Sequence, residues 1–303
     1  GTSSSSNYYV RIRVRVCDRS SSAGGLEDNC VKYGDNYKPE GLMQKYSNKI
    51  RYSAFGYLNQ GGDKRQGAVL RAQLGLIGPT KPVAMSTTPE TNGVAEWNGT
   101  TGVMNANPDS DLATNSDVSN SGVMNYLNQF GNYSSSYMTY DNVSELFYAA
   151  VRYFQNLGNV PEWTNGATVA QKDNFPAPAT WADPILYSCQ KNFILGIGDS
   201  NTHFDVNTGG NGGLTNQKGA ARAMPSAVTA DKFNLSATWT TAIETAEGLT
   251  GRGMRYGATP GSEFIAGLAY GNHVNDIRAD LTGKQSIDTY WMDVMEGQYA
   301  QDK

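Results

Sequence analysis

The main candidate for chemistry in this sequence is a carboxylate that directly follows an apolar run. Residues 193–198 read FILGIG, and Asp199 comes next, followed by four polar residues that end at His203. In sheets covered by helices, ligands bind at the carboxyl ends of the strands, and Asp199 would stand at one of those ends. Asp199 is therefore a candidate for a ligand-binding site. His203 either joins such a site or is an ordinary surface histidine.

Enzymatic chemistry finds little support in the residue types. The chain has only two histidines. An acid–base pair of Asp199 with His203 would make a hydrolase that lacks a visible nucleophile and oxyanion hole. The sequence contains no Gly-x-Ser-x-Gly elbow, phosphate-binding loop or paired cysteine–histidine motif. It therefore predicts a protein that is not an enzyme.

The three cysteines, Cys17, Cys30 and Cys189, show no zinc-site spacing. Cys17 and Cys30 flank a polar segment and, if oxidised, would close a compact loop that loop entropy makes worth about 3 kcal/mol. Three reduced thiols are the alternative. Cys189 is either a small buried hydrophobe or the partner of a cysteine outside this chain.

Composition narrows the class of protein. With 303 residues, a net charge of −4 and no long basic run, the chain lacks the pattern of a nucleic-acid-binding protein. No stretch approaches the ~18 consecutive apolar residues of a membrane-spanning helix. Charged residues make up only 17%, which together with abundant Gly, Asn, Ser and Thr is typical of long loops on a secreted scaffold. The chain opens GTSSSSNYY, without an export signal, so we expect a mature or excised fragment.

Apolar periodicity predicts an alternation of strands and helices. The predicted strands are residues 9–16, 51–58, 68–78, 193–198 and 286–296, and the predicted helices are residues 41–50, 122–131, 142–158 and 262–278. This order indicates a mostly parallel sheet covered by helices. FILGIG would then be a central strand buried on both faces. Asp199 would lie at its carboxyl end, where such sheets bind ligands.

Two loop-like regions interrupt this order. Residues 79–138 and 206–260 have the composition of surface insertions, here in a single domain of residues 1–303. At the amino-terminal end, valine and isoleucine alternate with three arginines along residues 9–16. That alternation predicts a half-exposed strand.

Four segments resemble the PilY/PilC family of large proteins associated with the tip of bacterial type IV pili. They are CQKNFILGIGDSNT, YKPEGLMQKYSNKIRYSAFGYLN, SELFYAAVRYFQNLG and GLAYGNHVNDIRADLTGKQSIDTYWMDVME. The amino-terminal region of that family is similar to a von Willebrand factor A domain. The resemblance therefore implies an α/β, Rossmann-like fold with a mostly parallel sheet flanked by helices, an N-terminal β-hairpin and long loop insertions. It does not extend to the family's C-terminal β-propeller.

The resemblance also implies a metal-ion-dependent adhesion site, in which a divalent cation (Mg²⁺, Ca²⁺ or Mn²⁺) takes oxygen ligands from three loops. Asp199 matches the third loop, which follows a strand. The second loop supplies a residue at the start of a helix, and the candidates near the helix at 142–158 are Thr139, Asp141 and Ser144. Capping of that helix by Asp141 or Ser144 is the alternative.

The first loop of that site has the pattern Asp-x-Ser-x-Ser. Asp18, Ser20 and Ser22 match it after the strand predicted at 9–16. In the family this motif leads directly into a helix, whereas here a long segment precedes the helix predicted at 41–50. A polar hairpin that faces the solvent is therefore the alternative role for these three residues.

For function, the resemblance implies a non-enzymatic adhesion or assembly module of a pilus tip protein, with roles in pilus biogenesis, surface attachment and mechanosensing. It implies an extracellular location at the pilus tip or bacterial cell surface. The implied partners are minor pilins, a host or abiotic surface, and the protein's own β-propeller. A structural subunit of an extracellular filament or surface assembly, without adhesin activity, is the alternative. We expect the two insertions to carry binding specificity, because exposed loops often do.

Overall fold

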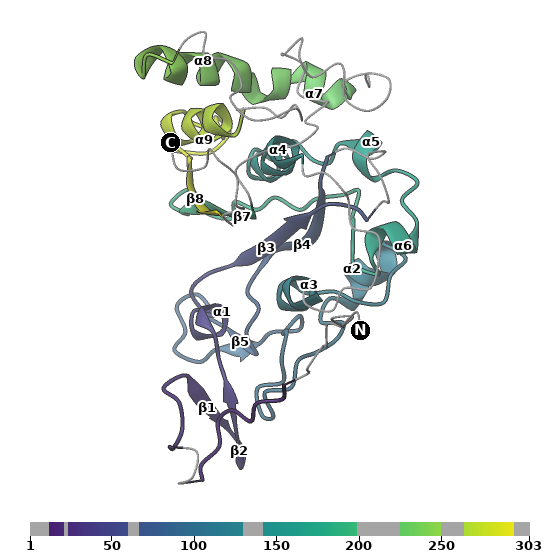
Figure 1. Cartoon of the computed structure of the whole chain (residues 1–303), viewed down its shortest axis with the longest axis vertical. Helices are drawn as coiled ribbons and strands as arrows, with labels where there is room; N and C mark the ends of the chain where they lie inside the picture. The colour runs from purple at the N-terminus through teal and green to yellow at the C-terminus, as the bar shows by residue number, and fades with distance from the viewer. Residues whose placement is uncertain are drawn as a thin grey trace, which may run out of the picture. The chain divides into compact units, whose positions relative to one another are not determined.

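The chain folds into two compact units (Figure 1). The structure is a computed structural model that describes residues 12–20, 24–59, 67–129, 142–198, 225–249 and 264–293. Unit 1 comprises Gly1–Arg51 and Leu76–Asn105, and unit 2 comprises Tyr52–Gly75 and Ala106–Lys303. The insertion predicted at 79–138 therefore begins in unit 1 and continues in unit 2.

Short antiparallel strand pairs form the framework of unit 1. β1 (Cys30–Tyr33) and β2 (Asn36–Pro39) make a hairpin, and β5 (Thr80–Lys81) pairs with β6 (Glu90–Thr91). Gly34 has a φ angle of 58° in the turn between β1 and β2, a conformation that glycine adopts without steric cost. Unit 1 therefore contains a hairpin near the amino-terminal end, although it lies at residues 30–39, where the sequence predicted no strand.

Two predicted elements of unit 1 differ from the structure. Residues 12–16, the described part of the strand predicted at 9–16, are not a strand, and Ile12 and Val14 are exposed. Alternation creates a face that can be buried, but a strand also needs a neighbour that completes its hydrogen bonds. The helix predicted at 41–50 is the single turn α1 (Leu42–Lys45), which buries no residue and so gains little from packing.

Unit 2 contains two strand pairs at the predicted positions. β3 (Tyr52–Gly56) and β4 (Val69–Gly75) are antiparallel, whereas β7 (Asn192–Gly198) and β8 (Ile287–Asp293) are parallel. The mixture of helices with small sheets agrees with an α/β fold. In the described part of the chain, however, parallel pairing is limited to β7 and β8 rather than extending through a larger sheet.

Helices make up most of the rest of unit 2. They are α2 (Ser110–Asn115), α3 (Val123–Asn128), α4 (Val143–Phe154), α5 (Pro161–Thr164), α6 (Val169–Lys172), α7 (Ser226–Ala230), the 3₁₀ helix η4 (Lys232–Leu235), α8 (Ser236–Ala246) and α9 (Phe264–Val274). Helices α3, α4 and α9 match predictions, whereas α7 and α8 show that the described part of the insertion at 206–260 is largely helical. None of the helices in the described ranges is long and apolar enough to cross a membrane.

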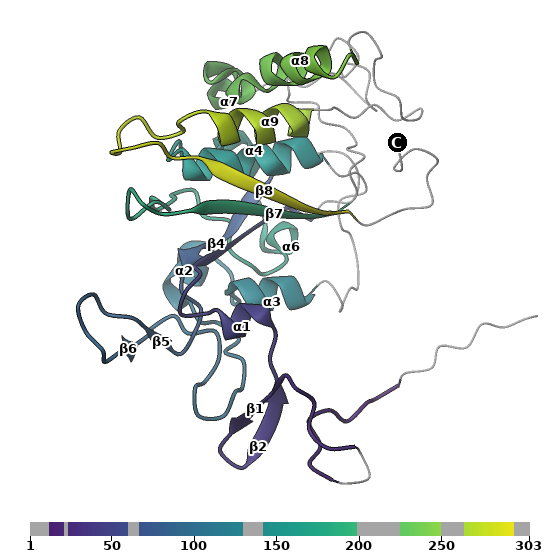
Figure 2. The same cartoon turned by 90° about the vertical axis from the view of Figure 1, so that its left-hand side faces the viewer.

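Helix α4 lies at the centre of the core of unit 2. Almost all of its side chains are buried, including the polar ones of Glu145 and Arg152. The core around it includes Ala68, Trp163, Ile185, Val228, Phe264, Leu268 and Ile287. Helix α9 lies between α4 and α8 (Figure 2). Because α4 is surrounded, its polar groups must find partners inside the protein.

Strand β7 is not buried on both faces, contrary to the prediction for FILGIG. Ile194 packs against the core beneath α4 and α9, but Phe193, Leu195 and Ile197 are exposed. Consecutive side chains of a strand point to opposite faces of a sheet, so a continuous apolar run does not by itself show that both faces are covered. Here the helices of the described chain cover one face.

Candidate functional site at the start of helix α4

The structure describes only some of the predicted metal ligands. Ser144 belongs to unit 2, and Asp18 and Ser20 belong to unit 1. The candidates that lie outside the described residues are Ser22, Thr139, Asp141 and Asp199. The three-loop metal site therefore stays a prediction.

Ser144 lies in the first turn of α4 and is fully buried. The residue at the N-cap position is Asn142, whose backbone carbonyl accepts hydrogen bonds from the N–H groups of Glu145 and Leu146, each at 3.1 Å. Ser144 therefore follows the cap instead of forming it. A buried hydroxyl in the first helical turn lies close to the positive end of the helix dipole, a setting that favours anionic or strongly polarised groups nearby.

Glu145 is a fully buried carboxylate that the sequence analysis did not single out. Its Oε2 atom accepts hydrogen bonds from the side-chain amide of Asn142 and from the backbone N–H of Gly67. Two N–H donors and the amino-terminal end of α4 together compensate its negative charge. The signal that could have revealed Glu145 is the Asn-x-x-Glu spacing, which resembles a capping box.

Gly67, whose N–H donates to Glu145, lies against the ring of Trp163, where a side chain has no room. Its φ angle is 82°, and an added Cβ would lie 1.9 Å from Cδ2 of Trp163. Glycine is therefore required at this position for both the backbone conformation and the close approach. The hydrogen bond to Glu145 ties Gly67, two residues before β4, to the start of α4.

The start of α4 thus gathers oxygen atoms of the kind that hard cations prefer. Besides the Glu145 carboxylate and the Ser144 hydroxyl, the cluster contains Asn142 Oδ1, which is buried and has no hydrogen-bond partner in the described part of the chain. The predicted ligands Thr139 and Asp141 immediately precede it in the sequence. These oxygens match a divalent cation in ligand type, whereas the positive end of the α4 dipole opposes a cation there.

Asp18 and Ser20 form a local polar turn in unit 1. The backbone N–H of Ser20 donates to Asp18 Oδ1 at 2.9 Å, and Arg15 Nε lies 3.2 Å from Asp18 Oδ2. The hydrogen bond from the Ser20 backbone is the main reason why the pKa of Asp18 lies below its ordinary value. Both carboxylate oxygens therefore already have partners within the turn.

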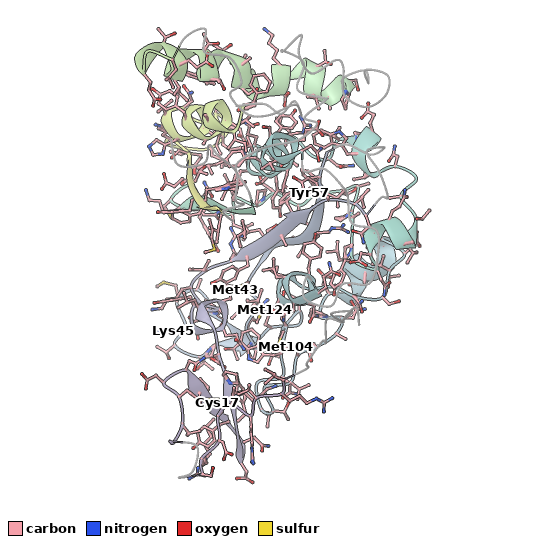
Figure 3. The ribbon with its side chains drawn as sticks, in the orientation of Figure 1. Cys17, Met43, Lys45, Tyr57, Met104 and Met124 are labelled. Atoms are coloured by element: carbon pink, nitrogen blue, oxygen red, sulfur yellow. A yellow bond between two sulfur atoms is a disulfide. The ribbon has the colours of Figure 1, made fainter. Side chains whose placement is uncertain are left out.

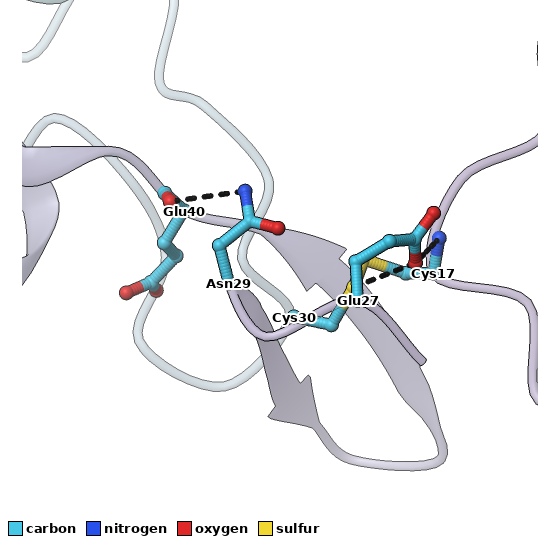
Figure 4. The surroundings of a disulfide bond; sticks show 5 residues. All are labelled: Cys17, Glu27, Asn29, Cys30 and Glu40. Carbon is cyan, nitrogen blue, oxygen red and sulfur yellow. Dashed lines mark hydrogen bonds between the residues drawn. A yellow bond between two sulfur atoms is a disulfide. The ribbon is translucent and has the colours of Figure 1, made fainter. Parts of the chain in front are cut away.

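A disulfide joins Cys17 to Cys30, as predicted (Figure 4), and Figure 3 labels the side chain of Cys17. The carboxylate of Glu27 accepts a hydrogen bond from the backbone N–H of Cys17 at 2.9 Å. In the described ranges, the sulfur atoms of Cys17 and Cys30 and a carboxylate oxygen of Glu27 lie close enough together to hold a metal ion. Because the two sulfur atoms are bonded to each other, neither is available as a thiolate ligand.

Cys189 is free and exposed, so it is not the buried small hydrophobe that was one of its two predicted roles. It lies in the turn that precedes β7. The other predicted role, as the partner of a cysteine outside this chain, is compatible with this exposure.

The chain is similar along nearly its whole length to a curated protein of Xylella fastidiosa that is named type IV pilus biogenesis factor PilY1 homolog. The two sequences are 42% identical over 316 residues, which cover 96% of this chain. The chain belongs to the PilY1 family. This confirms the resemblance that the four sequence segments indicated.

This PilY1-family chain spans 25% of the length of that relative. The identity therefore establishes the family, while the activity and the partners of the whole relative concern a much longer protein. No family model matches the PilY1-family chain, and no solved structure matches it.

A buried ion pair in the PilY1-family chain holds α4 in place. Arg152 Nη1 lies 2.9 Å from Oδ2 of Asp231, the residue that ends α7, and the Tyr148 hydroxyl donates to the same carboxylate. Arg152 also donates to the backbone carbonyls of Leu157 and Gly158. Burial is the main cause that raises the pKa of Tyr148, and the bond to Asp231 adds to it.

A second ion-pair network supports the segment between α9 and β8. The guanidinium of Arg278 donates to both carboxylate oxygens of Asp183 and to both of Asp280, each at 2.8 Å. These hydrogen bonds hold the pKa of Asp183 and that of Asp280 below their ordinary values. Asp183 precedes β7, so Arg278 links the chain segments that lead into both parallel strands.

Proposed function

We propose that this PilY1-family chain acts in type IV pilus biogenesis as a non-enzymatic adhesion or assembly module at the pilus tip. The observation that carries the proposal is the 42% identity, over 96% of the chain, to a protein named as a type IV pilus biogenesis factor. The residue types support a binding role, because the sequence contains no recognisable nucleophile–base motif.

The proposed location is the outside of the bacterial cell. Disulfides persist in oxidising compartments such as the periplasm and the cell surface, and the bond between Cys17 and Cys30 supports such a location. The proposed partners are minor pilins, a host or abiotic surface, and a β-propeller in the same polypeptide. Attachment at the tip would also make the module a candidate force sensor.

A von Willebrand A-like arrangement is proposed for unit 2. The parallel pairing of β7 with β8, and the position of α4 and α9 on one face of this pair, support it. Strand β7 ends at Gly198, directly before Asp199. In sheets of this kind, ligands bind at the carboxyl ends of the parallel strands.

We further propose that Asp199 binds a divalent cation together with oxygen ligands near the start of α4. Thr139, Asp141 and Ser144 are the candidates there. A cation that binds only the folded protein stabilises it by about 4 kcal/mol at a thousandfold excess over Kd.

Thermal unfolding in millimolar Mg²⁺, Ca²⁺ or Mn²⁺ tests this cation. We expect the metal to raise the melting temperature of the wild type and Asp199→Ala to abolish the increase. Asp111→Ala, which removes an exposed carboxylate in α2, is the matched control and should retain the increase. A wild-type protein with the same melting temperature in metal and in chelator would contradict the proposal.

The pilus function is tested by an in-frame deletion of the codons for residues 1–303 in the native bacterium. We expect fewer surface pili, measured by immunoblotting of pilin in sheared fractions, and weaker surface attachment. Unchanged pili together with unchanged attachment would contradict the proposal. Fewer pili with normal attachment per pilus would favour an assembly or structural role without adhesin activity.

Point variants separate adhesion from assembly. Met85 and Val103 are exposed within the insertion predicted at 79–138, so glutamate at either position should leave the fold intact. If this region binds a surface, Met85→Glu and Val103→Glu should reduce attachment at a normal number of pili. Leu42→Glu, at an exposed residue of the same unit outside the insertion, is the control. Normal attachment in both variants would exclude these positions from the binding surface.

A further inference from the structure

The parallel pair of β7 and β8 carries an exposed apolar face. Its five side chains, which we call the β7–β8 apolar face, are between 50% and 62% exposed: Phe193, Leu195, Ile197, Tyr290 and Met292. The register places Leu195 opposite Tyr290 and Ile197 opposite Met292, so the side chains form one continuous surface. The rings of Phe193 and Tyr290 lie 6.2 Å apart between centroids.

An apolar face of this kind is unusual for parallel strands. Parallel sheets occur almost only with helices on both faces, whereas antiparallel sheets often leave one face in water. In unit 2, Ile194 and Trp291 pack against the core that α4 and α9 form, on the face opposite the apolar one. Contiguous apolar surfaces of folded proteins usually mark binding sites. The β7–β8 apolar face therefore has the character of a buried surface whose cover is missing.

The edge of β7 points to the same conclusion. Among the described strands, β7 pairs with β8 on one side and with none on the other. Helix α4 packs against β7 and also against β3 and β4, which form a separate pair. An unpaired strand edge presents a row of N–H and C=O groups that readily pair with a further strand.

We propose that a strand–helix segment of the same polypeptide, outside residues 1–303, covers both features. Its strand pairs with the edge of β7 that none of the described strands occupies, and its helix lays an apolar side on the β7–β8 apolar face. The relative supplies the room for such a segment, since this chain spans 25% of its length. The inference rests on the uncovered sheet, so it does not depend on the proposed pilus function.

A second copy of this chain would not satisfy both features through one contact. Pairing of two β7 edges would extend the sheet and double its exposed apolar face. Packing of two apolar faces against each other would bury the face but leave both β7 edges open. A strand that continues into a helix covers an edge and a face together, as the connections of parallel sheets do.

Two matched substitutions test the proposal. Leu195 and Leu186 are 62% and 59% exposed, and only Leu195 belongs to the β7–β8 apolar face. Leu195→Glu and Leu186→Glu are compared in the 303-residue chain and in the polypeptide extended by the residues that flank it in its gene. In the shorter chain, both variants should melt within about 2 °C of the wild type. In the extended polypeptide, Leu195→Glu should lower the melting temperature by about 5 °C or more, and Leu186→Glu should not.

Hydrogen exchange of the wild-type proteins gives a second measurement that requires no substitution. We expect the amides of β7 to exchange at least tenfold more slowly in the extended polypeptide than in the 303-residue chain. Equal exchange in the two proteins, or equal effects of the two variants in the extended polypeptide, would overturn the proposal. A concentration-dependent dimer of the 303-residue chain that Leu195→Glu abolishes, with no added protection on extension, would assign the face to a second copy instead.

Discussion

Replacing Asp231 with alanine tests how firmly the core of unit 2 depends on the ion pair between α4 and the end of α7. The exposed fraction of the side chain is 5% for Arg152 and 19% for Asp231. The guanidinium therefore has little access to water, and the Asp231 carboxylate is its charged partner in the described part of unit 2. After the substitution, Arg152 would keep its hydrogen bonds to the carbonyls of Leu157 and Gly158, but these groups carry no net charge.

The size of the effect follows from this burial. Removal of one partner from a buried ion pair costs about 3–5 kcal/mol, because the other charge stays buried without compensation. Asp231 keeps some contact with water in the native protein, so we expect the lower end, a loss of about 3 kcal/mol for Asp231→Ala. Asp231→Asn keeps a hydrogen-bond acceptor for Tyr148 and should cost roughly half as much.

Urea unfolding followed by tryptophan fluorescence measures the change. Trp163 is a suitable reporter, because its ring lies 5.9 Å from that of Tyr148. At an m-value of about 1–3 kcal/mol/M, the midpoint should fall by roughly 1–3 M. Arg152→Met combined with Asp231→Leu should recover most of the loss, since an apolar pair removes the buried charge altogether. An unchanged midpoint for Asp231→Ala, or a double variant less stable than Asp231→Ala, would refute this reasoning.

Three further predictions follow from the structure. The double variant Cys17→Ser, Cys30→Ser should lower the free energy of unfolding of unit 1 by about 3 kcal/mol, because the disulfide closes a loop with a sequence separation of 13. Urea unfolding measures this change, and Cys189→Ser, which removes the free cysteine, is the control. Arg278 holds the pKa of Asp183 and that of Asp280 below their ordinary values. Both carboxylates therefore stabilise the protein above about pH 4. This stabilisation is lost as the pH falls through the lowered pKa values. Arg278→Met should therefore flatten the decline of the melting temperature at acidic pH, and an unchanged slope would contradict this. Gly267→Ala should lower the melting temperature, because the alanine Cβ would lie 2.2 Å from the carbonyl oxygen of Ser236. This clash should outweigh the helix propensity of alanine, which exceeds that of glycine by about 1 kcal/mol. A higher melting temperature would contradict the packing of α9 on α8.

Local patterns in the sequence were sufficient to predict most of the regular elements of unit 2. The strands β3, β4, β7 and β8 and the helices α3, α4 and α9 all lie where apolar periodicity indicated. The pairing of Cys17 with Cys30 was also predictable, because the chain contains so few cysteines and these two flank one short segment. Family membership was visible in four segments that span most of these elements.

The partners of the polar residues on α4 were not predictable from the sequence. Periodicity identified an apolar stripe on α4 but could not show that the remaining sides of the helix are buried as well. Glu145 depends on Gly67, and Arg152 depends on Asp231, each of which is far away along the chain. Such pairs form only when tertiary packing brings distant segments together, and no local spacing encodes them.

Other features also depended on tertiary packing. The apolar run of β7 indicated burial, yet whether both faces are covered depends on which helices lie against the sheet, and the described helices lie against one face. The valine–arginine alternation at residues 12–16 satisfied the pattern of a strand but did not produce one. Periodicity shows which side chains can share a face, because it follows from the geometry of a single strand or helix. Which face is buried depends on contacts between elements that are distant in the sequence.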